Sequence, residues 1–176
     1  MKVLVIYTSR GGASKSCVEL LEKKIGDSCE VVLCDAREAE TLPTPDTCDV
    51  LVMGGSVRFG RIDKKLKEYI KANVDKINAK PSAFFFCCGF PSELEDYIDT
   101  QLPKKAEFSL GIHCFGGELK PQKLKGMDKI VVKMIRSHIN SQDFEESDDY
   151  HMPLPELLPE SVQRLADDIR KSLVKK

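Results

Sequence analysis

The chain has 176 residues, of which 41% are hydrophobic and 31% are charged, as in an ordinary globular domain. We therefore expect one domain over residues 1–176. A formal net charge of −1 gives no general attraction to nucleic acid or anionic membranes, and no apolar run approaches the length of a membrane span.

Short apolar runs alternate with amphipathic segments along the chain. Runs that are apolar throughout are typical of strands buried on both faces of a parallel sheet, and the helical segments would cover those faces. This pattern predicts a doubly wound α/β fold. The expected strands are 3–7, 30–34, 50–53, 82–88 and 108–115. The first expected helix follows the glycines at 11–12, and the others cover 62–77, 92–102, 127–138 and 162–173. Residues 35–48 are expected to form a short or broken crossover, and residues 141–160 an exposed acidic loop.

Three of the expected strands end in loops of glycine and small polar residues: 8–14, 54–60 and 87–91. In open parallel sheets, ligands bind beyond the carboxyl ends of the strands. These three loops are therefore expected to meet at one edge and to form the ligand site.

The first of these loops, Thr8-Ser9-Arg10-Gly11-Gly12-Ala13-Ser14, has the composition of an anion cradle. Glycines permit close backbone approach, hydroxyls donate hydrogen bonds, and a helix start presents unpaired N–H groups. The alternative is a tight turn with Ser14 as helix cap. This loop does not match two other phosphate-binding motifs. It lacks the third glycine of the dinucleotide-binding fingerprint and both glycines of the P-loop motif.

The same loop resembles the phosphate loop of flavodoxins, which binds the phosphate of FMN. The sequence is most similar to menaquinone-dependent protoporphyrinogen oxidases of flavodoxin fold. Their second loop, Gly-Ala-Ser-Ile-Arg-Tyr-Gly, is similar to residues 54–60 (GGSVRFG), and their Pro-Ser-Ala-Phe is similar to residues 81–84. The resemblance implies a five-stranded sheet of order 2-1-3-4-5 that binds FMN. It implies cofactor contacts from Thr8, Ser9, Arg10, Gly11, Gly12, Ala13, Ser14, Ser56, Val57, Arg58, Phe59, Gly60, Cys88, Gly89 and Phe90.

A flavin ring needs a flat apolar slot, and the chain has no Trp to stack on it. Phe59 and Phe90 are the candidate stacking residues, and the alternative is that both simply cover the core. Arg58 is expected to neutralise negative charge on the reduced flavin or on an acidic substrate, unless it is a solvated surface residue. The flavin performs the redox step, so no catalytic residue and no metal are expected.

The seven cysteines include no CxxC pair, and no secretory signal is evident, so we expect reduced thiols in the cytoplasm. The adjacent Cys87 and Cys88 are either core packing or a redox relay beside the flavin. A basic helix near 120–136 either docks on a membrane surface or an acidic partner, or presents a solvated face.

Together these features predict a protein that binds FMN and acts in electron transfer or flavin-dependent oxidoreduction. Its expected partner is a redox protein or a quinone. The first alternative is a protoporphyrinogen dehydrogenase or quinone reductase of heme biosynthesis, and the second is a flavin-free binding module. Four acids follow the fourth expected strand and would repel the propionates of a porphyrinogen, which favours a carrier or a quinone-linked reductase. These acids are Glu93, Glu95, Asp96 and Asp99.

Overall fold

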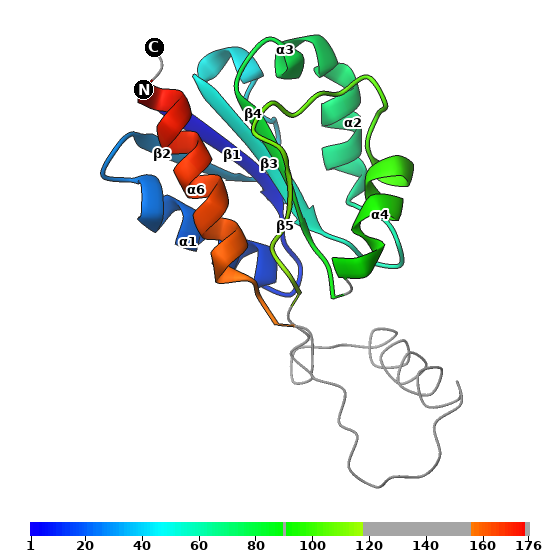
Figure 1. Cartoon of the computed structure of the whole chain (residues 1–176). Coiled ribbons are helices and arrows are strands. Elements are labelled where there is room, and N and C mark those ends of the chain that lie inside the picture. The colour runs from blue at the N-terminus through cyan, green and yellow to red at the C-terminus, as the bar shows by residue number, and fades with distance from the viewer. Residues whose placement is uncertain (90, 118–155, 175–176) are drawn as a thin grey trace, which may run out of the picture.

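A computed structural model describes residues 1–89, 91–117 and 156–174 (Figure 1). The five strands form one parallel sheet of order β2-β1-β3-β4-β5, which confirms the predicted fold class and strand order. The strands are β1 (Lys2–Thr8), β2 (Glu30–Asp35), β3 (Val50–Ser56), β4 (Ser82–Cys87) and β5 (Ile112–Cys114). The helices are α1 (Ala13–Ile25), η1 (Pro45–Thr47), α2 (Lys64–Ala72), α3 (Val74–Asn78), η2 (Pro91–Glu93), α4 (Leu94–Gln101) and α6 (Pro159–Val174).

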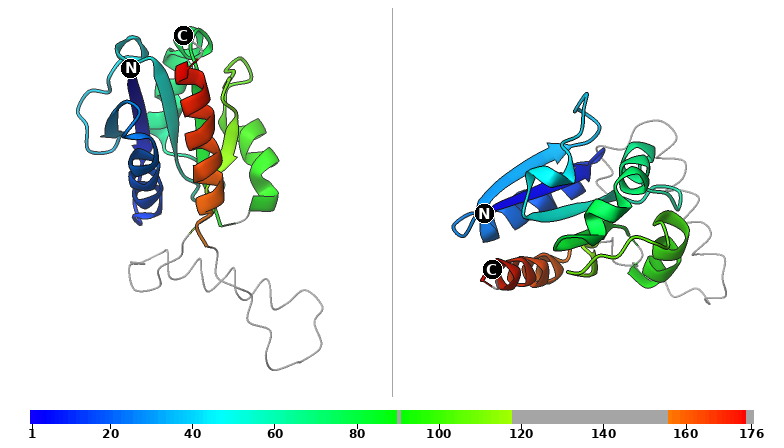
Figure 2. Two further views of the ribbon diagram at one scale, coloured as in Figure 1. Left: turned by 60° about the vertical axis from the view of Figure 1, so that its left-hand side comes forward. Right: turned by 90° about the horizontal axis from the view of Figure 1, so that it is seen from above.

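The sheet separates two hydrophobic clusters because alternate side chains of each strand point to opposite faces. On β1, Val3 and Val5 pack toward α1 and α6, whereas Leu4 and Ile6 pack toward α2, α3 and α4. Both faces of the sheet are thus covered by helices, as Figure 2 shows. This double coverage explains why the central strands are apolar throughout.

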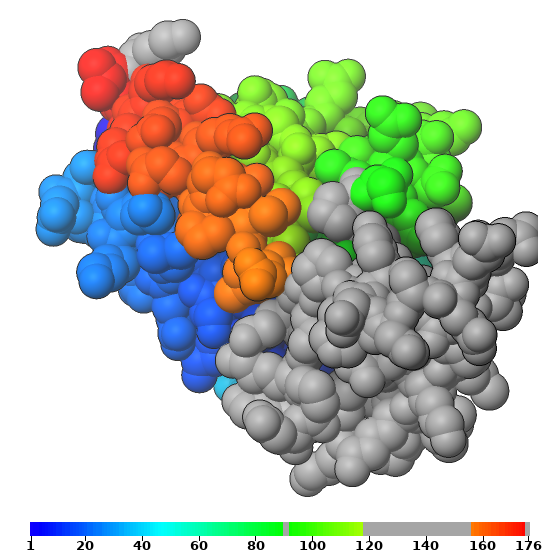
Figure 3. Space-filling view, turned by 60° about the horizontal axis from the view of Figure 1, so that its bottom comes forward, coloured from blue at the N-terminus to red at the C-terminus, as the bar shows by residue number. Residues whose placement is uncertain are grey.

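Helices α1 and α6 come from opposite ends of the chain and lie side by side on one face of the sheet. Figure 3 shows their surfaces meeting, with α1 in blue and α6 in orange. Two polar contacts join them: the Lys24 amine donates to Gln163, and the Arg170 guanidinium donates to the carbonyl oxygen of Lys24. The last helix therefore completes the layer that the first helix begins.

The predicted end of the third strand was wrong, because Gly54 and Gly55 lie inside β3 and not in the loop after it. Both glycines are there because the neighbouring strands approach closely. A Cβ on Gly54 would lie 2.2 Å from the carbonyl oxygen of Phe85, and one on Gly55 would lie 2.2 Å from the Thr8 hydroxyl oxygen. The loop after β3 consequently begins at Val57.

Three further boundaries differ from the sequence predictions. The segment over 62–77 divides at Asn73, whose side-chain amide donates to the Tyr69 carbonyl oxygen at 2.9 Å, and becomes α2 and α3. The segment over 92–102 begins as the single turn η2. The last strand is short because Gly111, at φ +86°, interrupts the extended backbone before Ile112.

Several predicted features lie outside the described residues. They are Phe90, the helix over 127–138, the basic segment near 120–136 and most of the acidic loop over 141–160. Within residues 1–89, 91–117 and 156–174, no helix is long and apolar enough to cross a membrane, and no group of three metal-ligating side chains occurs.

Candidate functional site

The first of the three predicted loops joins β1 to α1, and the first backbone N–H groups of the helix have no acceptor within it. Gly12 is the N-cap residue and has a positive φ of 94°, a conformation that glycine adopts without strain. The Ser9 hydroxyl oxygen accepts the Lys15 N–H at 3.4 Å. The N–H groups of Ala13 and Ser14 have no acceptor within the helix, since they belong to its first turn. The alternative that Ser14 caps the helix was wrong, because Gly12 occupies that position.

Two buried hydroxyl oxygens at this edge of the sheet make no hydrogen bond to any described residue: Thr8 Oγ1 and Ser14 Oγ. Thr8 faces Gly55 on the neighbouring strand and also lines the cleft described below. Ser14 lies beside the Cys87 thiol, on the side of the core. A buried hydroxyl is ordinarily hydrogen-bonded, so Thr8 is placed to contact a group that enters from the cleft.

The second predicted loop is a tight hairpin that presents Phe59. Arg58 and Arg61 exchange two backbone hydrogen bonds of 2.9 and 3.0 Å, so Phe59 and Gly60 are the two central residues of the turn. Both have positive φ, 51° and 73°, and Phe59 is the one non-glycine residue in the described part of the chain with that conformation. Its side chain is 65% exposed. Positive φ is uncommon in a bulky residue, and strained backbone is found chiefly at functional sites, so Phe59 is a candidate contact residue.

The third predicted loop follows β4 and packs tightly on the segment after β5. The N–H of Val57, from the second loop, donates to the Cys87 carbonyl oxygen at 2.9 Å and so joins the two loops. A Cβ on Gly117 would lie 2.7 Å from backbone atoms of Cys88 and Gly89. The three loops therefore do meet at the carboxyl edge of the sheet, with Gly89 the last described residue before Phe90.

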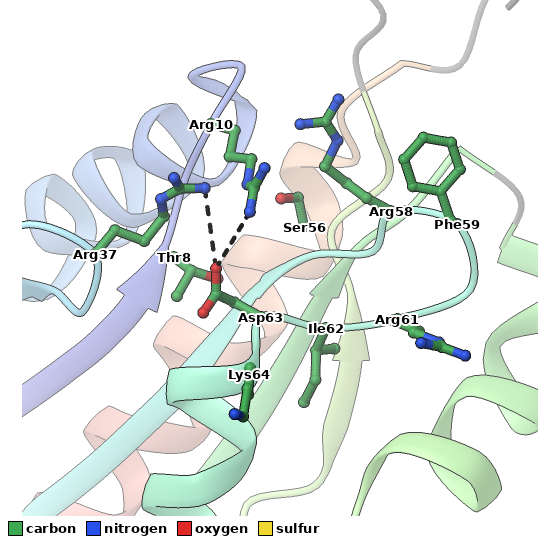
Figure 4. A pocket seen from close by; sticks show the side chains of 10 residues that line it. All are labelled: Thr8, Arg10, Arg37, Ser56, Arg58, Phe59, Arg61, Ile62, Asp63 and Lys64. Carbon is green, nitrogen blue, oxygen red and sulfur yellow. Dashed lines mark ion pairs between the residues drawn. The ribbon is translucent and has the colours of Figure 1, made fainter. Parts of the chain in front are cut away.

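A cleft of about 520 Å³ opens between the first and second loops (Figure 4). Its positive charge is pronounced, with four arginines and one lysine against a single carboxylate. Five of the predicted site residues line it: Thr8, Arg10, Ser56, Arg58 and Phe59. Five others complete it, namely Arg37, Arg61, Ile62, Asp63 and Lys64.

Asp63 is the carboxylate around which this cleft is organised. Its side chain accepts the Lys65 N–H at 3.0 Å and so caps the N-terminus of α2. It also lies 3.9 Å from the guanidinium groups of both Arg10 and Arg37 (Figure 4). Arg37 and Asp63 were missed in the sequence. The available signal was that Arg37 follows the carboxyl end of β2 by two residues, at the same edge of the sheet.

The four acids after β4 lie on η2 and α4, and none of them lines the cleft. The Tyr97 hydroxyl donates to the Glu93 carboxylate, and burial together with this carboxylate raises the pKa of Tyr97. Arginines, and not these acids, therefore set the charge that a molecule in the cleft would meet.

Comparison with known proteins identifies the relatives of this chain. The flavodoxin domain family matches residues 4–147. Protoporphyrinogen IX dehydrogenase [quinone] of Escherichia coli K12 is 27% identical over 88 residues, which are 48% of this chain and 47% of that protein. The protein of the same name from Leishmania major is 28% identical over 88 residues, 48% of this chain and 37% of its own length. The matches thus span about half the length of these curated relatives, or less.

Solved structures share the fold at low sequence identity. The two-electron reduced flavodoxin of Megasphaera elsdenii has a TM-score of 0.56 and 10% identity, over 96% of this chain and 98% of that one. A short-chain flavodoxin associated with a bacterial microcompartment has a TM-score of 0.56 and 13% identity, over 99% and 97% of the two chains. Rubredoxin oxygen:oxidoreductase of Desulfovibrio gigas has a TM-score of 0.55 and 12% identity, over 99% of this chain and 36% of that one.

Proposed function

We propose a role for each loop of the site from the premise that the chain belongs to the flavodoxin domain family. The family is one of FMN-binding proteins, so FMN is the cofactor. The residues present fit the phosphate end of FMN. The space above Gly11 and Gly12 is open, the N–H groups of the first turn are available, and the buried Thr8 hydroxyl needs a partner. We assign the phosphate to the loop from Ser9 to Ser14, with Ser14 contributing its backbone N–H.

The ring of FMN would lie between the second and third loops. Phe59 supplies the exposed aromatic surface, and Gly89 lies where the backbone of the third loop reaches this edge. Bound FMN supplies one-electron and two-electron redox chemistry, while the protein supplies position and electrostatics. The remaining predicted contacts are Ser56, Val57, Arg58, Gly60, Cys88 and Phe90.

The function that the site supports best is FMN-dependent oxidoreduction with an electron partner that reaches the flavin through the arginine-lined cleft. One observation carries this proposal: the cleft of about 520 Å³ opens directly between the proposed phosphate loop and Phe59. A space of that size accommodates a small molecule such as FMN, and the electron partner would then meet the flavin at the arginine-lined mouth of the cleft. A quinone, or the surface of a redox protein, is the partner class that we propose first.

A second candidate is porphyrinogen dehydrogenation. The curated relatives carry that name, and the arginines of the cleft are suited to bidentate contacts with propionates. The position of Glu93, Glu95, Asp96 and Asp99 outside the cleft weakens the argument that acids would repel this substrate. The four acids still contribute a longer-range repulsion that salt would screen.

Two measurements test these proposals. Purified protein should show flavin absorption between about 350 and 500 nm, the range characteristic of this cofactor. The flavin should then be reduced anaerobically with dithionite and reoxidised with menadione, a soluble quinone. Rapid reoxidation supports a quinone-linked reductase, and reoxidation no faster than that of free reduced FMN contradicts it. Anaerobic reduction by protoporphyrinogen, followed by turnover with menadione, would instead establish the second candidate.

A further inference from the structure

Two cysteines that are far apart in the sequence have their sulfur atoms in contact. Cys88 Sγ lies 3.5 Å from Cys114 Sγ, and all seven cysteines are in the thiol form. The sequence drew attention to Cys87 and Cys88 as neighbours, but the sheet separates them. Cys87 packs on the α1–α6 side, whereas Cys88 and Cys114 lie on the α2–α4 side.

The backbone around this pair holds the two thiols close. Cys114 is paired in register with Phe86, two residues before Cys88, and the Phe115 N–H donates to the Phe86 carbonyl oxygen at 2.8 Å. Gly117 packs directly on the backbone of Cys88 and Gly89. A disulfide has an S–S length of about 2.04 Å, so the sulfurs need to approach by about 1.5 Å. Side-chain rotation can supply much of that movement.

The two thiols are not chemically equivalent. The hydrogen bond from Cys88, together with the backbone N–H groups of Gly116 and Cys88, lowers the pKa of Cys114 to about 6 against the opposing effect of burial. Cys114 is partly exposed, while Cys88 is 3% exposed. Cys114 therefore has the properties of an attacking thiolate, and Cys88 those of the thiol that resolves the intermediate.

The other thiols provide a contrast within the same molecule. Cys87 and Cys17 form a second pair, but both are at most 3% exposed, and the pKa of Cys87 is raised by its contact with Cys17 and by burial. Burial also raises the pKa values of the three partly exposed cysteines, which are Cys29, Cys34 and Cys48. Among the seven cysteines, only the pair of Cys88 and Cys114 combines sulfur atoms in contact with one partly exposed member and a lowered thiol pKa.

We propose that Cys88 and Cys114 form a reversible disulfide by exchange with a low-molecular-weight disulfide such as oxidised glutathione. The Cys114 thiolate attacks one sulfur of the oxidant, forms a mixed disulfide and releases one thiolate. Cys88 then loses its proton, attacks the Cys114 sulfur and releases the second thiol. Overall, two protein thiols are oxidised to one disulfide, and one external disulfide is reduced to two thiols. This exchange takes no electrons from the flavin, and the one residue that it shares with the proposed flavin contacts is Cys88.

The test uses the full-length protein with its bound cofactor, incubated with oxidised glutathione at pH 7 and quenched with N-ethylmaleimide before peptide mass spectrometry. We expect one cross-linked peptide pair that joins Cys88 to Cys114, lighter by two hydrogens, and its reversal by reduced glutathione. Cys88→Ser should accumulate glutathione on Cys114, whereas Cys114→Ser should leave Cys88 unmodified. Cys17→Ala, in the buried pair, is the matched control and should cross-link as the wild type does.

Three results would overturn the proposal. In the wild type these are full alkylation of both cysteines after oxidation, glutathione retained on Cys114 without a cross-link, and oxidation of Cys29, Cys34 or Cys48 ahead of this pair. Each is measured on the wild-type protein, so the outcome does not depend on whether a variant folds.

Discussion

Gly55 lies so close to Thr8 on the neighbouring strand that a Cβ on Gly55 would come within 2.2 Å of the Thr8 hydroxyl oxygen and 2.9 Å of its carbonyl oxygen. Gly55→Ala must therefore displace Thr8 from the edge of the proposed phosphate site. We expect overpacking to lower the free energy of unfolding by about 1–3 kcal/mol, and we expect FMN affinity to fall. Urea denaturation and a fluorescence titration with FMN measure the two effects.

The control for this change is Gly11→Ala, because no atom lies within 4 Å of a Cβ at Gly11. That variant should retain the stability of the wild type. If Gly55→Ala bound FMN as tightly as the wild type, Thr8 would have no role in holding the phosphate.

Gly12→Val should abolish FMN binding in a protein that still folds. The positive φ of 94° at Gly12 disfavours any side chain, at a cost of about 1–2 kcal/mol, and a branched side chain would fill the space above the loop. The measurement is the FMN dissociation constant, with circular dichroism to verify folding. Tight binding by a folded Gly12→Val variant would place the phosphate elsewhere.

Phe59→Ala should weaken FMN binding by about 1–3 kcal/mol, the usual contribution of a buried aromatic side chain. Phe59→Asn separates this contact from the backbone strain, because Asn tolerates positive φ better than most residues. We expect both variants to lose FMN affinity and Phe59→Asn to be no less stable than the wild type. Unchanged affinity in both would show that the ring stacks on another residue.

The rate at which Cys114 is alkylated should depend on pH, and the midpoint of that dependence should reveal the effect of Cys88 on the pKa of Cys114. Cys88, as hydrogen-bond donor, is the main cause of the pKa of about 6. Alkylation of Cys114 by iodoacetamide should therefore reach its half-maximal rate near pH 6, and Cys88→Ala should move this midpoint upward. Peptide mass spectrometry of samples quenched between pH 5 and 9 gives the rate for this site alone.

The same shift links stability to pH. Folding lowers the pKa of Cys114 from about 9, so its contribution to stability is complete above that value and is lost as the pH falls through about 6. If the alkylation rate of Cys114 in the wild type reached half its maximum near pH 9, Cys114 would not be a thiolate at neutral pH, and the assignment would be contradicted.

Two substitutions at Asp63 should distinguish its capping role from its charge. Asp63→Ala removes the acceptor for the Lys65 N–H and should lower the free energy of unfolding by about 1 kcal/mol. Asp63→Asn keeps an N-cap acceptor and removes the negative charge between Arg10 and Arg37. It should therefore be more stable than Asp63→Ala in urea denaturation. Equal losses in the two variants would mean that the charge, and not the cap, is what stabilises this helix.

The strands and the meeting of the three loops could be predicted because apolar runs and glycines are local signals, whereas the strand order followed from the resemblance to flavodoxins. Val3 to Tyr7 is apolar at every position, as a strand buried on both faces requires. The helix start after Gly11 and Gly12 was predicted for the same reason, since glycine adopts the positive φ found at Gly12 without strain. These features depend on residues adjacent in the sequence.

The features that could not be predicted depend on distant residues. Gly54 and Gly55 read as a loop because nothing in the sequence shows that Phe85 and Thr8 press on them from neighbouring strands. The contact between Cys88 and Cys114 needs the register of β4 and β5. Arg37 reaches the cleft only because β2 and β1 end at the same edge of the sheet.

The pairing of α6 with α1 has a consequence for the order in which the molecule can fold. Among the described residues, the cluster on the α2–α4 side uses none later than Cys114, so this part of the core can assemble before α6 has been translated. The other cluster joins Val3 to Ile169 and stays incomplete until α6 has emerged from the ribosome. Contacts between residues so distant in sequence slow folding. Until then α1 alone covers this face of the nascent sheet, and the apolar area that α6 will cover stays exposed, where a chaperone that binds apolar surface could protect it.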